Sequence, residues 1–149
     1  FEESLTRLVR CAGGNGNLLM NIGPMPTGEI DTREADRLKR IGEWLKTQGE
    51  SIYGTVGGPF KPGDYGVSTR KGNVIYVHVL KWPASGMLSL PAVPATLKGA
   101  KLLSGGKVEV KQADGRLQIS VAAADRMPVD TVVALTFDKS VMEFAATNP

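Results

Sequence analysis

The residues that could do chemistry in this chain are few, and local structure explains most of them. The 149 residues include 15 carboxylates, one histidine and one cysteine. Asp31 and Glu34 have the spacing of a helix-capping pair, and Asp114 precedes a glycine in a strong turn motif. General acid–base catalysis needs a group placed in a pocket beside its substrate, and no carboxylate here has such a setting. We therefore expect no catalytic residue within this chain.

The single histidine and the single cysteine point away from metal and nucleophile chemistry. His78 lies within an apolar, strand-like run at 74–80, on the same face as Tyr76. No second histidine is present for a relay, and Cys11 has no partner for a disulfide. Structural zinc sites take about four Cys or His ligands, which this composition cannot supply. We expect a structural His78, no metal and no cofactor.

Asn21 is the one candidate for a substrate contact. It lies near the end of a short apolar run at 18–22, between a turn rich in glycine and asparagine and the stop formed by Gly23 and Pro24. The run lacks alternation between apolar and polar residues, which is typical of a strand buried on both faces between helices. In a (β/α) barrel the C-terminal ends of such strands carry the active site. We predict that Asn21 points at substrate; the alternative is that its amide bonds to neighbouring loop backbone.

Helices are expected on both sides of this run. Residues 1–12 place Leu5 and Val9 on one apolar helical face, and a second helix is predicted from Thr32, with Asp31 as N-cap and Gly49 as C′ residue. Helix, buried strand and helix together indicate the tail of a βα-repeating architecture. Because a single strand cannot form a sheet, we expect the beginning of the protein to be missing.

The rest of the chain is predicted to be β-structure. Glycines and prolines crowd residues 51–66, which indicates a linker or domain seam. Strands are expected at 67–69, 74–80, 87–90, 100–103, 108–111, 117–122, 131–137 and 141–144. Alternation in several of these runs is typical of an antiparallel sandwich. The expected fold is an α/β tail from a (β/α) barrel at 1–50, the seam at 51–66 and an antiparallel β-sandwich at 67–146, largely β overall.

Composition excludes two classes of partner. Hydrophobic residues make up 42% of the chain, yet no apolar run approaches the roughly 20 residues that cross a bilayer. The formal charge of +3 comes from interspersed basic and acidic residues, whereas a nucleic-acid surface requires clustered Lys and Arg. We expect neither a membrane nor a nucleic acid as partner. No targeting segment is present by which to predict a location.

Several separated blocks of the sequence resemble one enzyme family. These blocks are GNGNLLMNIGP at 14–24, GEI at 28–30, IGEWL at 41–45 and GESIYGT at 49–55. In order and spacing they closely resemble the α-L-fucosidases of glycoside hydrolase family 29. In that family they mark the last strand and helix of the catalytic barrel and the passage into a C-terminal β-sandwich.

The resemblance implies a retaining hydrolase that removes terminal α-L-fucose from fucosylated oligosaccharides or glycoconjugates and needs no cofactor. Such enzymes use a nucleophilic aspartate and an acid/base carboxylate about 5 to 5.5 Å apart. In the family both precede the segment seen here, so we expect this chain to close and brace the barrel and to be inactive alone. The missing N-terminal part of the barrel is then its partner, and the family suggests an exported protein.

Two other hypotheses remain open at this stage. A carbohydrate-binding or interaction module would be favoured if Tyr76 and Trp82 were exposed together on one flat face. The sandwich is otherwise poor in aromatic residues on which a sugar could stack. Alternatively, the sandwich could be fused to a degenerate barrel that has lost its carboxylates.

Overall fold

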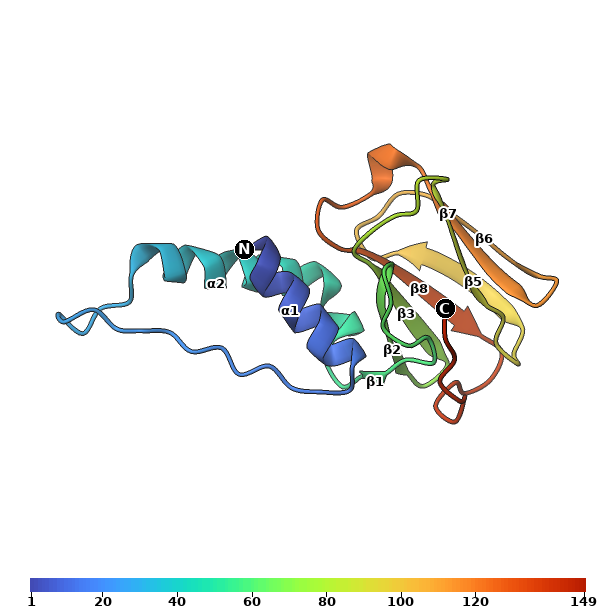
Figure 1. Ribbon diagram of the computed structural model, residues 1–149, viewed down its shortest axis with the longest axis horizontal. Helices are drawn as coiled ribbons and strands as arrows, with labels where there is room; N and C mark the ends of the chain where they lie inside the picture. The colour runs from blue at the N-terminus through green and yellow to red at the C-terminus, as the bar shows by residue number, and fades with distance from the viewer.

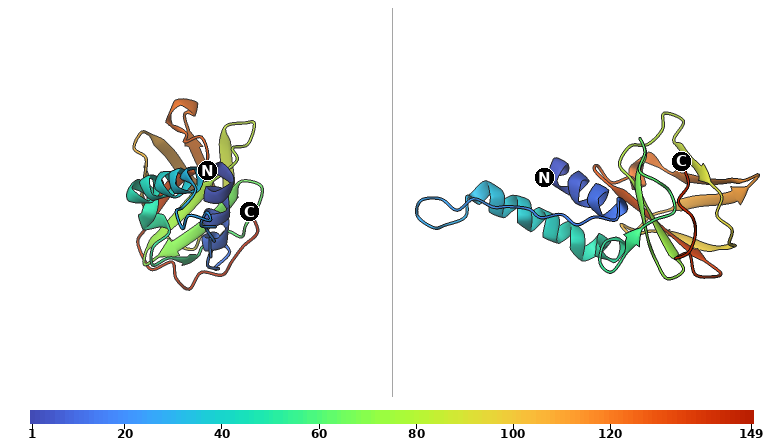
Figure 2. Two further views of the ribbon diagram at one scale, coloured as in Figure 1. Left: turned by 90° about the vertical axis from the view of Figure 1, so that its left-hand side faces the viewer. Right: turned by 60° about the horizontal axis from the view of Figure 1, so that its bottom comes forward.

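A computed structural model describes residues 1–149 and divides them into a helical part and a β-sandwich. The helical part contains α1 (Glu2–Gly13), α2 (Thr32–Gln48) and the short 3₁₀ turn η1 (Gly49–Ser51). Figures 1 and 2 show both helices projecting from one side of the sandwich, with a long loop running along α2 between them. No helix in the structure has the length and apolarity needed to span a membrane.

The second helix begins at the expected residue. The Asp31 carboxylate accepts a hydrogen bond from the Arg33 backbone N–H at 2.8 Å, which satisfies one of the free donors of the first turn. As predicted, α2 ends directly before Gly49, which is its C-cap residue, but Gly49 lacks the left-handed conformation expected of a C′ glycine. Gly49 has a right-handed φ of −61°, and the chain continues into η1 because Ile52 and Tyr53 donate to its carbonyl.

The sandwich consists of two antiparallel sheets, as the alternation predicted. The larger sheet has the order β1-β2-β3-β8-β5 and the smaller has the order β4-β7-β6. A 3₁₀ turn, η2 (Ala123–Asp125), precedes the last strand. The strands are β1 (Val56–Gly57), β2 (Gly66–Lys71), β3 (Val74–Val79), β4 (Met87–Pro91), β5 (Leu97–Leu102), β6 (Val108–Ala113), β7 (Arg116–Val121) and β8 (Thr131–Phe137).

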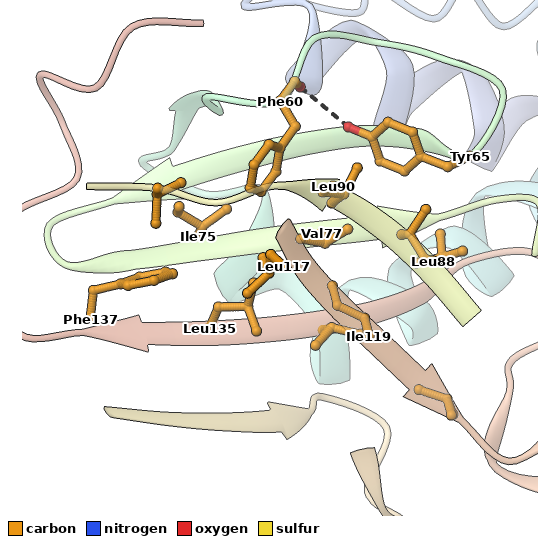
Figure 3. Packing of buried hydrophobic residues seen from close by; sticks show 14 of the residues in the cluster. Phe60, Tyr65, Ile75, Val77, Leu88, Leu90, Leu117, Ile119, Leu135 and Phe137 are labelled. Atoms are coloured by element: carbon orange, nitrogen blue, oxygen red, sulfur yellow. Dashed lines mark hydrogen bonds between the residues drawn. The ribbon is translucent and has the colours of Figure 1, made fainter. Parts of the chain in front are cut away.

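The larger sheet is buried on both faces. Its inner face packs on the smaller sheet through an apolar core that includes Phe60, Leu117 and Phe137 (Figure 3). On its outer face, Leu5 and Val9 of α1 and other helical side chains cover β2, β3 and β8. This double burial explains why β3 and β8 are almost continuously apolar, whereas β7 alternates.

The predicted strand at 141–144 is wrong. This segment is instead an irregular tail, and Arg70 Nη1 donates to the carbonyls of Val141 at 3.0 Å and Phe144 at 2.7 Å. A parallel bridge between Phe60 and Thr147 holds the end of the tail beside the seam. The tail therefore bonds to a side chain and to the seam, and it contributes no strand to either sheet. The seam itself contains β1, which glycine and proline content did not reveal.

The expected buried strand at 18–22 is not formed within this chain. Residues 17–23 form no helix or strand, and the Leu19 side chain is 88% exposed. An isolated extended segment cannot satisfy its backbone donors and acceptors without neighbouring strands. The apolar side chains of this segment are therefore left half-buried or exposed in this chain, instead of being covered on both faces.

Candidate functional site

The loop that carries Asn21 is extended and free of backbone hydrogen bonds. No N–H or C=O group of residues 17–22 has a backbone partner. Side chains alternate along it: Leu18 and Met20 are half-buried, whereas Leu19 and Asn21 are exposed. Since successive side chains of extended backbone point to opposite faces, Asn21 shares a face with Leu19, opposite to the partly covered pair.

Contacts at both ends hold this segment near the helices. At its C-terminal end, the Gly23 N–H donates to the Glu34 carboxylate at 3.2 Å. Glu34 was expected to complete a capping box at the start of α2; it instead anchors the loop that follows Asn21. Before the segment, the Asn15 side-chain oxygen accepts from the Gly57 N–H at 3.1 Å. Glu34 of α2 and Gly57 of β1 therefore hold the chain on either side of the free segment.

A cavity of about 270 Å³ lies between the segment and the two helices. Its walls come from α1, α2 and the loop: Ser4, Arg7, Glu34, Arg37, Leu38 and residues 18–22. Arg7 forms a salt bridge with Glu3 on the same helix. Glu34 is the single carboxylate of the lining, so the cavity lacks the pair of carboxyl groups on which a two-carboxylate hydrolase depends.

Two carboxylates outside this cavity, those of Asp31 and Asp138, have structural partners. Asp31 pairs with the Arg33 guanidinium at 2.9 Å, and this hydrogen bond, with the backbone bond from Arg33, lowers the pKa of Asp31 to about 2. Asp138 accepts a hydrogen bond from the Thr96 N–H at 3.0 Å, which lowers its pKa. No three His, Cys, Asp or Glu side chains come together as metal ligands.

His78 has a partner that sequence reasoning missed. Its Nδ1 lies 2.7 Å from Asp130 Oδ2, and both side chains are completely buried. The two residues are 52 positions apart, so no local spacing could have indicated the pair. Burial also separates this pair from any substrate in solution.

The aromatic residues of the sandwich do not form an exposed platform. Tyr76 is only 6% exposed beneath the helices, and burial raises the pKa of its phenol. Trp82 is half-buried, and the Arg126 guanidinium stacks 4.4 Å from the centre of its ring. The flat pair that would have favoured a carbohydrate-binding module is therefore absent.

Comparison with known proteins agrees with the resemblance seen in the sequence. The family model described as alpha-L-fucosidase matches residues 2–50. Human plasma alpha-L-fucosidase is 40% identical over 115 residues, which cover 72% of this chain and 24% of that protein. The chain belongs to the α-L-fucosidase family. Human tissue alpha-L-fucosidase is 34% identical over 104 residues, 68% of the chain and 22% of its own length.

Solved α-L-fucosidase structures share the fold of nearly the whole chain. Isoenzyme 1 from Paenibacillus thiaminolyticus has a TM-score of 0.82 and 30% identity, covering 93% of this chain and 34% of its own. A family 29 α-L-fucosidase from Bacteroides thetaiotaomicron, trapped as a covalent intermediate, has a TM-score of 0.80 and 26% identity, with coverage of 91% and 32%. The chain thus spans about a quarter of the curated fucosidases and about a third of the solved ones.

Proposed function

We propose that this chain is the C-terminal portion of a retaining α-L-fucosidase that acts on terminal α-L-fucose in oligosaccharides or glycoconjugates. Residues 1–50 end the catalytic barrel, residues 51–66 form the seam and residues 67–146 form the bracing sandwich. The observation that carries the proposal is the free extended segment at 17–22 in a chain that matches about one third of solved fucosidases.

The geometry of that segment suits the last strand of a barrel. A strand inside a barrel bonds to a neighbour on each side, and both edges of residues 17–22 are unbonded here. Helices of a (β/α) barrel lie outside its strands, so in this proposal the half-buried Leu18 and Met20 are the side chains that face the helices. Leu19 and Asn21 then face the barrel interior, with Asn21 near the end that carries active sites.

The catalytic carboxylates belong, in this proposal, to the part of the protein outside this chain. Asp31 and Asp138 have structural partners, and Glu34 is the single carboxylate of the cavity beside the segment, so this cavity offers no pair of carboxyl groups for a double displacement. The related enzyme from Bacteroides thetaiotaomicron was trapped as a covalent intermediate with 2-fluoro-fucosyl fluoride. A covalent intermediate is the mark of a retaining mechanism, which supports the same assignment here.

The sandwich has a bracing role because the helices pack on the outer face of its larger sheet. Leu5, Val9 and Trp44 of the helices contact Val67 and Val132 of that sheet. Burying large apolar side chains of this kind stabilises a contact by about 1.5 to 3 kcal/mol each. The contact with the larger sheet therefore fixes the position of the helices that would flank the last barrel strand.

An assay on an aryl α-L-fucoside tests the proposal. We expect the full-length protein to release the aryl alcohol, and the 149-residue chain, verified by an intact mass near 15.9 kDa, to release none. NMR of the first sugar formed should show the α-anomer of fucose, since two displacements retain configuration. Release of the β-anomer would contradict the retaining mechanism, and an inactive full-length protein would contradict the activity itself.

A further inference from the structure

The loop between the free segment and α2 is an ordered hairpin. Its ends, Pro24 and Ile30, pair as an antiparallel bridge. The Gly28 N–H donates to the Met25 carbonyl at 2.8 Å, and the Met25 N–H donates to the Glu29 carbonyl, also at 2.8 Å. Gly28 has a left-handed φ of +86°, and a tight turn followed by such a glycine is a common three-residue connection of β-hairpins. The hairpin therefore has a defined shape of its own.

Contacts on both sides attach the hairpin to α2. Directly before it, the Gly23 N–H donates to the Glu34 carboxylate at 3.2 Å. Directly after it, the Asp31 carboxylate accepts from the Arg33 N–H at 2.8 Å and caps the helix. Figures 1 and 2 show the hairpin at the end of the helical part that is remote from the sandwich. The hairpin therefore extends past the end of the free segment, in the direction in which that segment runs.

The two faces of the hairpin have different surroundings. Met25 is half-buried and, together with Arg33 and Glu34 at the start of α2, lines a hollow of about 310 Å³. Successive side chains of extended backbone point to opposite faces, so Pro24 and Ile30 lie on the face turned away from α2. Pro24 is exposed, and Ile30 is 43% exposed. One face of the hairpin thus looks toward the helix, and the other is an uncovered apolar surface.

We propose that this apolar face, formed by Pro24 and Ile30, binds the leaving group of the substrate, which is the sugar to which fucose is attached. The inference rests on the proposed function, in which the free segment is the last strand of the barrel. Active sites of such barrels lie at the C-terminal ends of the strands, among the loops that join each strand to the following helix. The hairpin is such a loop. Because the helices lie outside the strands, the face turned away from α2 is turned toward the barrel axis.

The position and chemistry of the apolar face suit the second sugar better than the fucose. Fucose in the proposed site lies beside the strand ends, near Asn21, whereas the hairpin extends beyond them. The side chains of Pro24 and Ile30 contain only carbon and hydrogen, so they can pack on the C–H groups of a sugar ring. Because backbone hydrogen bonds already hold the hairpin, little conformational freedom is lost when a sugar packs on it. The face therefore selects among leaving groups without touching the bond that is cleaved.

Kinetics of the full-length protein on substrates that share fucose and differ in the leaving group test the proposal. One substrate is α-L-fucosyl fluoride, whose leaving group is too small to reach the hairpin; the others are the disaccharides fucosyl-galactose and fucosyl-N-acetylglucosamine. We expect Ile30→Ala to lower kcat/KM on at least one disaccharide by roughly tenfold, the effect of removing methylene groups from an apolar contact. The value of kcat/KM on the fluoride should be unchanged. Equal losses on all substrates, or no loss on any, would overturn the proposal.

Met25→Ala is the matched control, because it shortens an apolar side chain on the opposite face of the same hairpin. This change can loosen the hairpin from α2 but removes no contact with the leaving group. We expect the ratio of kcat/KM on the disaccharides to kcat/KM on the fluoride to stay as in the wild type. If Met25→Ala changed this ratio as much as Ile30→Ala, the effect would come from general loosening and the proposal would be wrong.

The ratio of the two kcat/KM values also keeps the test valid if a variant folds poorly. Both values are measured on one preparation, so the inactive fraction of the enzyme cancels. Pro24→Ala, on the same face as Ile30, gives a second reading and should lower the ratio in the same direction. A full-length wild type that is inactive on every substrate would overturn the proposed function and this inference with it. Activity on the fluoride, with an unchanged ratio in both variants, would overturn the inference alone.

Discussion

Gly13, the last residue of α1, lies so close to Val67 of β2 that a β-carbon on Gly13 would be 2.3 Å from the Val67 β-carbon. No real side chain tolerates such a distance, so the helix backbone rests directly on the sheet. This contact places the end of α1, and with it the start of the loop that carries Asn21, against the sandwich. Glycine is required here for close approach rather than for an unusual backbone angle.

Replacing Gly13 with alanine should therefore loosen α1 from the sandwich. We expect Gly13→Ala to lower the free energy of unfolding by about 1 to 3 kcal/mol, the usual effect of overpacking a filled interior. The matched control is Gly42→Ala in α2, where an added β-carbon meets nothing within 4 Å. That change should stabilise the protein by about 0.5 to 1 kcal/mol, because alanine favours the helix. Denaturant unfolding of both variants distinguishes the two effects, and equal stabilities would contradict the close contact.

Arg70 should determine whether the C-terminal tail stays on the sandwich. Its guanidinium donates to two tail carbonyls, those of Val141 and Phe144. Arg70→Met keeps much of the apolar stem but leaves both carbonyls without this donor, and we expect a loss of about 1 to 3 kcal/mol. Faster amide exchange should appear in residues 138–147. Arg116→Met is the control, because the exposed Arg116 also donates to a carbonyl, that of Ser89, yet holds no tail.

Acid should weaken the start of α2 through Asp31. The pKa of this carboxyl is lowered from 3.8 to about 2 in the folded protein, so the folded state favours the ionised form. Its contribution is therefore complete above about pH 4 and is lost as the pH falls toward 2. Asp31→Asn keeps a capping oxygen but removes the charge. The variant should be less stable than the wild type at pH 6 and nearly equal to it at pH 2; a constant difference in thermal unfolding would contradict this assignment.

Local patterns predicted those elements whose stability is local. The start of α2 was predictable because Asp31 satisfies a donor two residues away. Strand β7, which is buried on one face, was predictable from the alternation of apolar and polar residues. Strand β8 was predictable from its continuous apolar run. The antiparallel sandwich followed from these runs, and the structure confirms it.

Predictions failed where distant residues decide the structure. The tail at 141–144 reads as a strand, but its carbonyls bond to Arg70, some 70 positions earlier, instead of to a ladder. The run at 18–22 has the composition of a buried strand, and no other segment of this chain pairs with it. The Asp130 partner of His78 was invisible for the same reason. The substrate contact of Asn21 stays a prediction. It depends on a substrate and on neighbouring barrel strands, neither of which the sequence pattern of this chain defines.

Asn21 and Asn17 offer a direct test of the orientation of the barrel strand. Both are exposed amides on the same extended segment, one near each end. If the segment is a barrel strand, Asn21 lies near the catalytic rim and Asn17 lies at the opposite, stability-related face. Asn21→Ala in the full-length protein should lower kcat/KM on an aryl α-L-fucoside by roughly tenfold to a hundredfold, the loss expected when a buried polar contact to substrate is removed. Asn17→Ala should change kcat/KM by less than about twofold and act, if at all, on thermal stability. Equal losses of kcat/KM in the two variants, or a loss confined to Asn17→Ala, would place the active rim elsewhere and remove Asn21 from the substrate site.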